Sequence, residues 1–468
     1  MSEKALSAST LEALRQNFDA RESNRIAMNA VTSVGINEAA KNFDRARLLS
    51  RRFSTVVDNG SATSQKRSGR CWLFSSLNVA RFIAKREMNL KDNDFEFSQS
   101  YAMYFDKLER ANYFMEDMKQ LIAAGEASDS RLVQFLLHDL MGDGGQWTMA
   151  MNIYTKYGAV PKDFFPETAS SQNTGEMNTQ LRAALRQAVA HMYAHPEQAE
   201  TIAAEAVEQA HRILTIHLGT PPTSFEWEYT DKDGVFHNEG TMTPVEFWNK
   251  YVTAGLEDYV CLVDDPRSEH PKGKMIGIEH LGNVVGGTPT AYLNVDTDFM
   301  KQCARTIMQE QGIPVWFGAD CHPMMDRKEG AWATDLFEYG RVYNIDFDLN
   351  KEERVRFADS AMNHAMAFAG VDVAAGTSGN ASGDAEASVE ASVEAGAAAE
   401  GTTKRWRVEN SWGTDIADKG YFTMSDDWFD EFVYEVAVPK SMLPAEYQAA
   451  LEEEPIMLPA WDPMGALA

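Results

Sequence analysis

Cysteine is scarce in this chain. The 468 residues include four cysteines, Cys71, Cys261, Cys303 and Cys321, and no two of them form a C-x-x-C pair. Such wide spacing in so long a chain argues against a disulfide framework and against a zinc site. Cys261 and Cys303 lie in stretches typical of a core, whereas the setting of Cys321, "GADCH", indicates no particular role. We therefore expect reduced thiols, no metal and no other cofactor.

Long apolar runs are also missing. No stretch approaches the roughly eighteen apolar residues that a membrane span needs. The opening residues, "MSEKALSASTLEALRQNFDA", have no apolar core of a signal peptide. We therefore expect a cytoplasmic protein that makes no membrane contact.

Basic residues are outnumbered. The chain has 43 Lys and Arg against 70 Asp and Glu, which gives a net charge of −27. Nucleic-acid binding requires clustered Lys and Arg to neutralise phosphates. The charge balance therefore argues against nucleic acid as the main partner, although it leaves room for a local basic patch.

The apolar pattern changes along the chain. Up to about residue 220 the spacing is helical, as in the stretches that start at Cys71 and near Ser98. Farther on, "SFEWEYTDKDGVFHNEGTMTP" predicts a hairpin, and "TAYLNVD", "GIPVWFGAD", "TKRWRVENSW" and "GYFTMS" predict strands. The length predicts one large elaborated domain or two to three subdomains, and the order of elements predicts an α+β arrangement.

The segment 371–403 differs from the rest in composition. It has no Lys, Arg or aromatic residue, and it contains the direct repeat "ASVEASVE". Such a segment buries too little apolar surface to offset the entropy of ordering. We expect a flexible surface loop that is a tolerated insertion rather than a functional element.

Cys71, in "QKRSGRCWLFSS", allows two interpretations. Free cysteine usually packs as a small buried hydrophobe. The start of a helix also suits a nucleophilic cysteine, because the helix dipole and a histidine partner lower the pKa of its thiol. Cys71 alone does not decide between the two.

Possible partners for such a thiol occur much later in the chain. His364 lies among small and apolar residues in "ADSAMNHAMAFAGV", although a structural histidine would fit there too. We expect His138 to be a core residue, because it lies in an apolar helical stretch. Asn410 ends a predicted strand and begins "NSWG", which on its own is a turn signal.

Four local patterns occur together in the order Gln65, Cys71-Trp72, His364 and Asn410-Ser-Trp-Gly. This order resembles papain-like cysteine proteases. Ser68 and Arg70 depart from the papain signature, and Cys71 and His364 are 293 residues apart instead of about 130–150. These departures, with "SGRCWLF", "FSQSYAMYFDKLERANYF", "GDGGQW", "GNVVGGTPTAYLNVD", "PVWFGAD", "VENSWG", "KGYF" and "EEPIMLPAWDPMGALA", resemble the bleomycin hydrolase and aminopeptidase C family.

The resemblance implies an α+β papain-like fold with large helical insertions, in which a helical lobe carries the cysteine and a β-barrel-like lobe carries the histidine and asparagine. The ranges that we expect are an N-terminal extension at 1–60, the helical lobe at 61–175, a helical insertion at 176–225, the β-rich lobe at 226–445, and a C-terminal arm at 446–468 that reaches the active site.

The resemblance also implies catalytic roles. Cys71 would be the nucleophile that forms a thioester, and His364 would be the general base and then the acid. Asn410 would orient the imidazole, and Gln65 would donate to the oxyanion together with the Cys71 backbone N–H. Trp412 would shield the bond between His364 and Asn410, and it could equally be a packing residue.

Supporting and substrate-binding residues follow from the same resemblance. Trp72 would support the nucleophile. Gly144 and Gly145 would let a substrate backbone approach, although a plain turn explains either glycine equally well. Asn363 would contact the leaving side of the substrate, and the carboxylate of Ala468 would pair with the substrate's α-ammonium.

The implied protein is a cytoplasmic aminopeptidase for peptides that assembles as a homohexamer with internal active sites. Two alternatives stay open: an oligo-endopeptidase with an open cleft, and a non-catalytic homologue that binds nucleic acid. The intact set of Gln65, Cys71, His364 and Asn410 argues against the second alternative.

Overall fold

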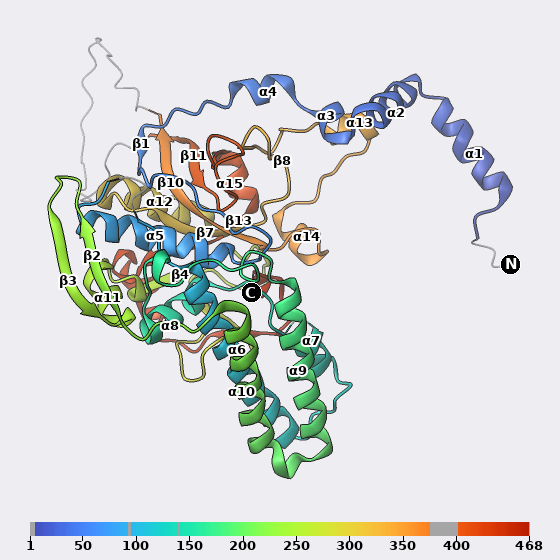
Figure 1. The fold of residues 1–468 in the computed structure, drawn as a ribbon. Coiled ribbons are helices and arrows are strands. Elements are labelled where there is room, and N and C mark those ends of the chain that lie inside the picture. Colours follow the sequence, from blue (N-terminus) through green and yellow to red (C-terminus); the bar gives the residue numbers. More distant parts are fainter. Residues whose placement is uncertain (1–4, 92–94, 139, 375–400, 468) are drawn as a thin grey trace, which may run out of the picture.

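A large β-sheet forms the centre of the molecule (Figure 1). The computed structural model describes residues 5–91, 95–138, 140–374 and 401–467. Within this part of the chain, 12 strands form one sheet in the order β14-β5-β6-β4-β13-β7-β10-β11-β12-β9-β8, and β1 pairs with β10 outside that order. The strands are β1 (Thr55–Val56), β4 (Tyr259–Val263), β5 (Met275–Ile278), β6 (Ala291–Asn294), β7 (Val315–Ala319), β8 (Met325–Asp326), β9 (Ala331–Trp332), β10 (His364–Val373), β11 (Thr403–Glu409), β12 (Tyr421–Ser425), β13 (Val433–Pro439) and β14 (Ile456–Leu458).

Helix α5 (Cys71–Glu87) packs directly on this sheet, against β10 and β7. Nearly all of its side chains are buried, so it is an interior helix with protein on every side. Helix α8 (Trp147–Tyr157) packs against α5 and ends at Gly158, whose φ is 67°. A Cβ at Gly158 would lie 2.1 Å from the carbonyl oxygen of Pro244, so only glycine fits this helix end.

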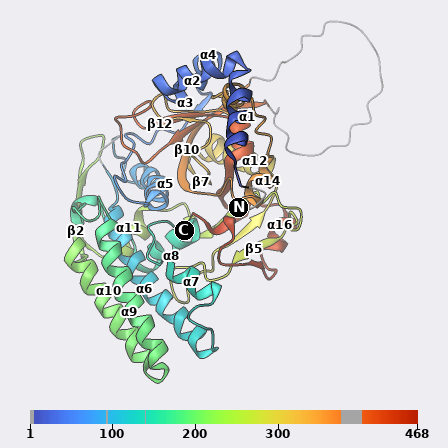
Figure 2. The ribbon, with the colours of Figure 1, turned by 90° about the vertical axis from the view of Figure 1, so that its right-hand side faces the viewer.

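Four helices form a projection that extends away from the sheet (Figures 1 and 2). They are α6 (Gln99–Ala123), α7 (Arg131–His138), α9 (Gly175–Ala194) and α10 (Ala199–Leu218). The buried residues of α10 recur every three or four positions and face α6 and α9. Ser98 caps α6 by accepting a hydrogen bond of 3.0 Å from the backbone N–H of Tyr101.

The N-terminal part forms an arm that leaves the body (Figure 1). Helices α1 (Ala8–Asp19) and α2 (Glu22–Val34) have no buried residue, whereas α3 (Ile36–Ala40) rests on the body through Ala40. Helix α4 (Phe43–Leu48) continues the arm toward β1. No helix in the described ranges is long and apolar enough to cross a membrane.

The remaining helices are α11 (Pro244–Tyr251), α12 (Thr297–Thr306), α13 (Tyr339–Tyr343), α14 (Lys351–Arg356), α15 (Asp426–Phe432) and α16 (Ala445–Ala450). In space these helices surround the sheet, and in the sequence they fall between its strands. The predicted hairpin is confirmed as a separate two-stranded sheet of β2 (Phe225–Thr230) and β3 (Phe236–Met242).

The predicted change from helices to strands is confirmed, and so is the α+β arrangement. Cys261 and Cys303 are buried, as expected of core residues. The prediction for His138 is wrong: its side chain is exposed, because α7 buries Val133 and turns His138 to the outside. Most of the 371–403 segment, residues 375–400, lies outside the described residues. Its ends do not, since Val373 pairs with Thr403 across the neighbouring strands β10 and β11.

Candidate active site

Cys71 is the first residue of α5, where the backbone N–H groups of the helix start are free of intrahelical partners. Its side chain is 4% exposed, and its Sγ accepts a hydrogen bond of 3.4 Å from the backbone N–H of Ala365. Ala365 is the second residue of β10, so this contact joins the helix start to the strand that begins with His364.

Arg70, which departs from the papain signature, is a buried ion-pair residue. Its Nη1 and Nη2 donate to Oε1 and Oε2 of Glu167 at 3.0 and 2.9 Å, and its Nε donates to Ser68 Oγ at 2.9 Å. The bidentate geometry fixes the backbone directly before Cys71. Both departures from the signature, Ser68 and Arg70, therefore belong to one local network.

His364 and Asn410 meet across the neighbouring strands β10 and β11. The distance from His364 Nε2 to Asn410 Oδ1 is 2.9 Å, and the backbone N–H of Ser411 also donates to that oxygen, at 2.7 Å. Because an amide oxygen only accepts, Nε2 carries the proton, and the neutral ring presents Nδ1 as an acceptor. Trp412 stacks on the imidazole at 5.0 Å between ring centroids and covers this pair.

Gln65 is held from both sides. Its backbone N–H donates to the carbonyl of Ser411 at 2.8 Å, and its Oε1 accepts from Ser411 Oγ at 2.5 Å. Its Nε2 donates to the carbonyl of Ser68 at 2.5 Å. An amide nitrogen has two hydrogens, so a second donor remains on Gln65 in addition to the one that Ser68 accepts.

The loop before α8 packs on the indole ring of Trp72, the residue that follows Cys71. Trp72 is fully buried, and its Nε1 donates to the carbonyl of Asp143 at 2.7 Å. A Cβ at Gly145 would lie 2.5 Å from Trp72 Cε2, so Gly145 is needed for close packing on the indole. Gly144 instead lines the cavity at Cys71, and its carbonyl accepts a hydrogen bond from Arg110.

Asp143 is a residue that sequence reasoning missed. Its carboxylate accepts from the backbone N–H of Gly69 at 3.1 Å and from Asn178 Nδ2 at 2.8 Å, and Lys107 Nζ lies at 2.8 Å. Burial alone would raise the pKa of Asp143, but Lys107 and the hydrogen-bond donors hold it well below its usual range. The "GDGGQW" stretch contained the signal, since an acid between glycines needs a partner when buried.

A cavity of about 380 Å³ opens at Cys71 and His364. It is lined by Gln65, Gly69, Cys71, Gly142, Asp143, Gly144, Asn178, Arg182, Asn363, His364, Ala466 and Leu467. Asn178 and Arg182 come from α9, so the helical projection contributes one wall, which the sequence did not predict. The side chain of Asn363 is engaged by Asp320 and by the backbone N–H of Cys321, at 2.6 and 3.1 Å.

The end of the chain reaches this cavity. Strand β14 pairs with β5 in parallel at one end of the sheet order, and the chain then runs to Ala466 and Leu467 in the cavity wall. Leu467 is 3% exposed, and a Cβ at Gly318 would lie 3.4 Å from its Cδ2. Ala468, the predicted partner of the substrate amine, lies outside the described residues.

Burial dominates the titration of the two reactive groups. It raises the pKa of the Cys71 thiol to about 11, although the N–H of Ala365 and those of the helix start lower it. It lowers the pKa of His364 to about 4, and the bond to Asn410 opposes that shift. Both shifts favour the neutral forms, the thiol of Cys71 and the imidazole of His364, in the same cavity.

Comparisons with known proteins agree with this arrangement. Residues 5–465 match the Peptidase C1-like family. The chain is 36% identical to aminopeptidase C of Lactobacillus delbrueckii subsp. lactis, over 99% of each chain, and 37% identical to bleomycin hydrolase of Homo sapiens, over 100% of each. A crystal structure of PepW from Lactobacillus rhamnosis HN001 matches with a TM-score of 0.90 and 36% identity, over 100% of both chains.

The chain therefore belongs to the Peptidase C1-like family and is a papain-like cysteine peptidase. The family resemblance that the sequence motifs indicated is confirmed, and so is the papain-like α+β fold.

Proposed function

We propose that the protein is a cytoplasmic cysteine aminopeptidase whose C-terminal arm restricts cleavage to free N-termini. The observation that carries the proposal is that Ala466 and Leu467 line the same cavity as Cys71 and His364. A chain end fixed beside the nucleophile leaves little room for substrate on one side of the scissile bond. Its carboxylate, at Ala468, would pair with the α-ammonium of a bound peptide.

In the proposed reaction, the Cys71 thiol passes its proton to Nδ1 of His364, and the sulfur attacks the carbonyl carbon of the first peptide bond. The second Nε2 hydrogen of Gln65 and the Cys71 backbone N–H stabilise the oxyanion. The imidazolium then protonates the leaving amine, and a thioester remains. Water, deprotonated by His364, hydrolyses the thioester and regenerates the thiol.

Asn410 would keep Nε2 of His364 protonated so that Nδ1 faces the thiol, and Trp412 would keep water from that hydrogen bond. Gly144 offers backbone groups to a substrate along the cavity wall, while Gly145 acts through its packing on Trp72. Asn363 would contribute at the leaving side through its backbone, since its side chain is already bonded to Asp320.

The test compares the full-length protein with a variant that lacks Leu467 and Ala468. Each receives a peptide with a free N-terminus and the same peptide N-acetylated, and mass spectrometry identifies the products. We expect the full-length enzyme to release single N-terminal residues and to leave the acetylated peptide intact. The truncated enzyme should cut both peptides internally, and Cys71→Ala should cut neither.

Internal cleavage of the acetylated peptide by the full-length enzyme would favour the oligo-endopeptidase alternative. The net charge of −27 still argues against nucleic acid as a partner. The same charge imbalance does not bear on peptides, whose recognition here depends on the cavity and the arm.

A further inference from the structure

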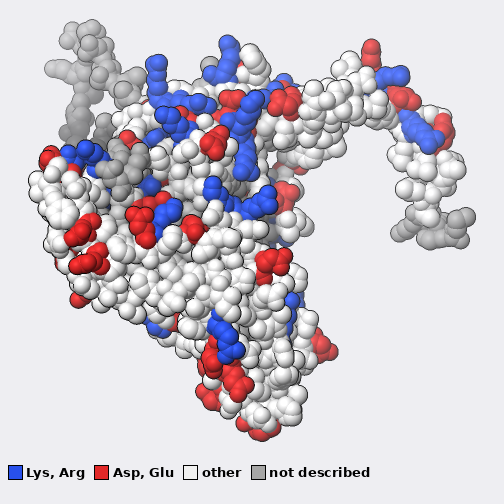
Figure 3. Space-filling model, viewed as in Figure 1, with Lys and Arg blue, Asp and Glu red and all other residues white. Residues whose placement is uncertain are grey.

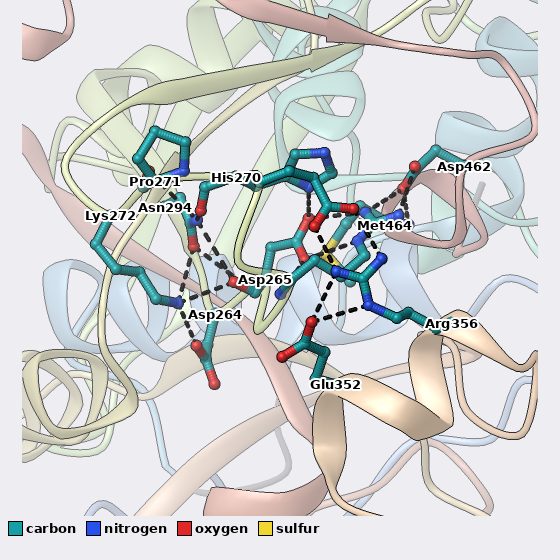
Figure 4. A network of polar contacts seen from close by, with 12 residues as sticks. Asp264, Asp265, His270, Pro271, Lys272, Asn294, Glu352, Arg356, Asp462 and Met464 are labelled. Carbon is teal, nitrogen blue, oxygen red and sulfur yellow. Dashed lines mark hydrogen bonds and ion pairs between the residues drawn. The ribbon is translucent and has the colours of Figure 1, made fainter.

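The segment between β14 and the cavity is tied to the body by one buried arginine. Nη1 and Nη2 of Arg267 donate to Oδ2 and Oδ1 of Asp462 at 2.9 and 2.8 Å. Nε and Nη2 of Arg267 donate to Oδ1 and Oδ2 of Asp265 at 2.9 and 2.7 Å. All three side chains are buried, so water screens these ion pairs little. Figure 4 shows Asp265 and Asp462 on either side of this network.

Asp265 belongs to the rigid side of the network. It follows β4, and its backbone N–H donates to Asn294 Oδ1 at 3.0 Å, at the end of β6. His270 Nδ1 lies 2.6 Å from Asp265 Oδ2 and fixes the carboxylate from a further direction. Asp265 is thus anchored to β4 and β6, two neighbouring strands of the large sheet.

Asp462 belongs to the arm and starts its last turn. Its Oδ1 accepts from the backbone N–H of Met464 at 3.0 Å and caps the turn Pro463–Gly465. Met464 is fully buried, and a Cβ at Gly465 would lie 3.2 Å from Ile278 Cγ2. The position of Asp462 therefore sets the position of Leu467, five residues farther on.

We propose that Arg267 is a positioning residue: its bidentate pair with Asp462 holds the C-terminal arm in the cavity and thereby keeps the peptidase from cutting internal bonds. This inference rests on the proposed function of the arm. A fork-shaped guanidinium between two carboxylates fixes direction as well as distance, which a hydrophobic contact does not. Without the pair, the arm keeps the three residues of β14, the apolar contacts of Met464 and Leu467, and the contacts of Trp461 with Arg131 and Phe135, none of which has the fixed direction of the bidentate pair.

Asp462→Asn is the sharpest variant. Asparagine has nearly the same shape and still accepts from Met464, so the turn survives while the charge that pairs with Arg267 is lost. Arg267 keeps Asp265 as a partner, which avoids an unpaired buried charge. Arg267→Met is the second variant. Arg356→Met is the control, because Arg356 also pairs with two carboxylates, Glu269 and Glu352, is more exposed than Arg267, and has no contact with the arm among the described residues.

Two measurements are made on each full-length variant, after thermal unfolding shows that it is folded. The first is the rate of internal cleavage of the N-acetylated peptide relative to N-terminal release from the free peptide. The second is the rate at which carboxypeptidase Y removes Ala468 and Leu467, followed by intact mass. We expect both to rise at least tenfold in Asp462→Asn and Arg267→Met and to stay within twofold of wild type in Arg356→Met.

The variant without Leu467 and Ala468 separates the two possible failures. If it cuts the acetylated peptide but Asp462→Asn and Arg267→Met behave as wild type in both measurements, the proposal for Arg267 is overturned and the function of the arm stands. If it does not cut the acetylated peptide, the function of the arm is overturned, and with it the effect of the pair on cleavage. The rate of release by carboxypeptidase Y then tests only whether the pair between Arg267 and Asp462 anchors the arm.

Discussion

Glu435 is a buried acid outside the active site. It lies on β13, is fully buried, and neither carboxyl oxygen has an N–H or O–H donor among the described residues. Its polar neighbour is the weakly donating thiol of Cys261. Burial without a strong hydrogen-bond donor disfavours the ionised carboxylate, so Glu435 makes the stability of the fold depend on pH.

Burial raises the pKa of Glu435 from 4.5 to about 8. Between these values the folded protein keeps a proton that the unfolded chain releases, so this residue lowers stability progressively as pH rises through that window, with the full penalty above it. We expect Glu435→Gln to unfold at least about 2 °C higher than wild type at pH 9 and at nearly the same temperature at pH 5. Calorimetry at both pH values measures this, and an equal difference at both would contradict it.

Among the elements, β10 is the strand that connects the candidate catalytic residues. It begins with His364, binds the Cys71 sulfur through Ala365, and pairs with β7, β11 and β1. Eight of its ten residues are buried, so it is held on both faces as well as on both edges. The connection from β10 to β11 leaves the sheet at Val373 and returns at Thr403, at the end of β10 opposite His364.

Replacing residues 375–400 with a short Gly-rich turn therefore preserves the pairing of Val373 with Thr403. We expect kcat and KM for a free peptide to stay within twofold of wild type, because the strand end that carries His364 is untouched. Steady-state kinetics on the purified variant measures this. A loss of kcat greater than tenfold in a folded variant would show that the segment contributes to catalysis.

At the scale of the whole molecule, the N-terminal arm exposes apolar side chains. Leu11, Leu14 and Phe18 of α1 and Ile26 of α2 are exposed, in helices that bury nothing. Exposed apolar side chains on a projecting helix favour contact with another chain. Charge is unevenly distributed too, with acidic side chains at the end of the helical projection and basic ones over the body near the arm (Figure 3).

We propose that these arms join six copies into the homohexamer that the family resemblance implies. Removing residues 1–34 should then reduce the mass measured by light scattering to that of smaller species. It should leave hydrolysis of a short free peptide largely unchanged, since the arm makes no contact with Cys71 or His364 among the described contacts. An unchanged mass would assign assembly to another surface.

Local sequence patterns were sufficient to predict the candidate catalytic residues. Short local patterns identify Cys71, His364, Asn410 and Gln65 as candidates. The helix start at Cys71 and the strand that leads to Asn410 follow from local periodicity, whereas strand β10, which begins at His364, was not predicted. The hairpin at 225–242 likewise needed only its alternation and its Asp-Gly turn.

Which distant residues meet around the site depends on how the chain packs in three dimensions. Asp143 pairs with Lys107, 36 positions away, and Arg267 pairs with Asp462, 195 positions away. Arg182 of α9 lines the cavity although it is about 110 positions from Cys71. No periodicity encodes such pairs, because a buried charge can be satisfied by any chain segment that packs beside it. The exposure of His138 has the same cause: a helix shows which residues share a face, but the packing decides which face is covered.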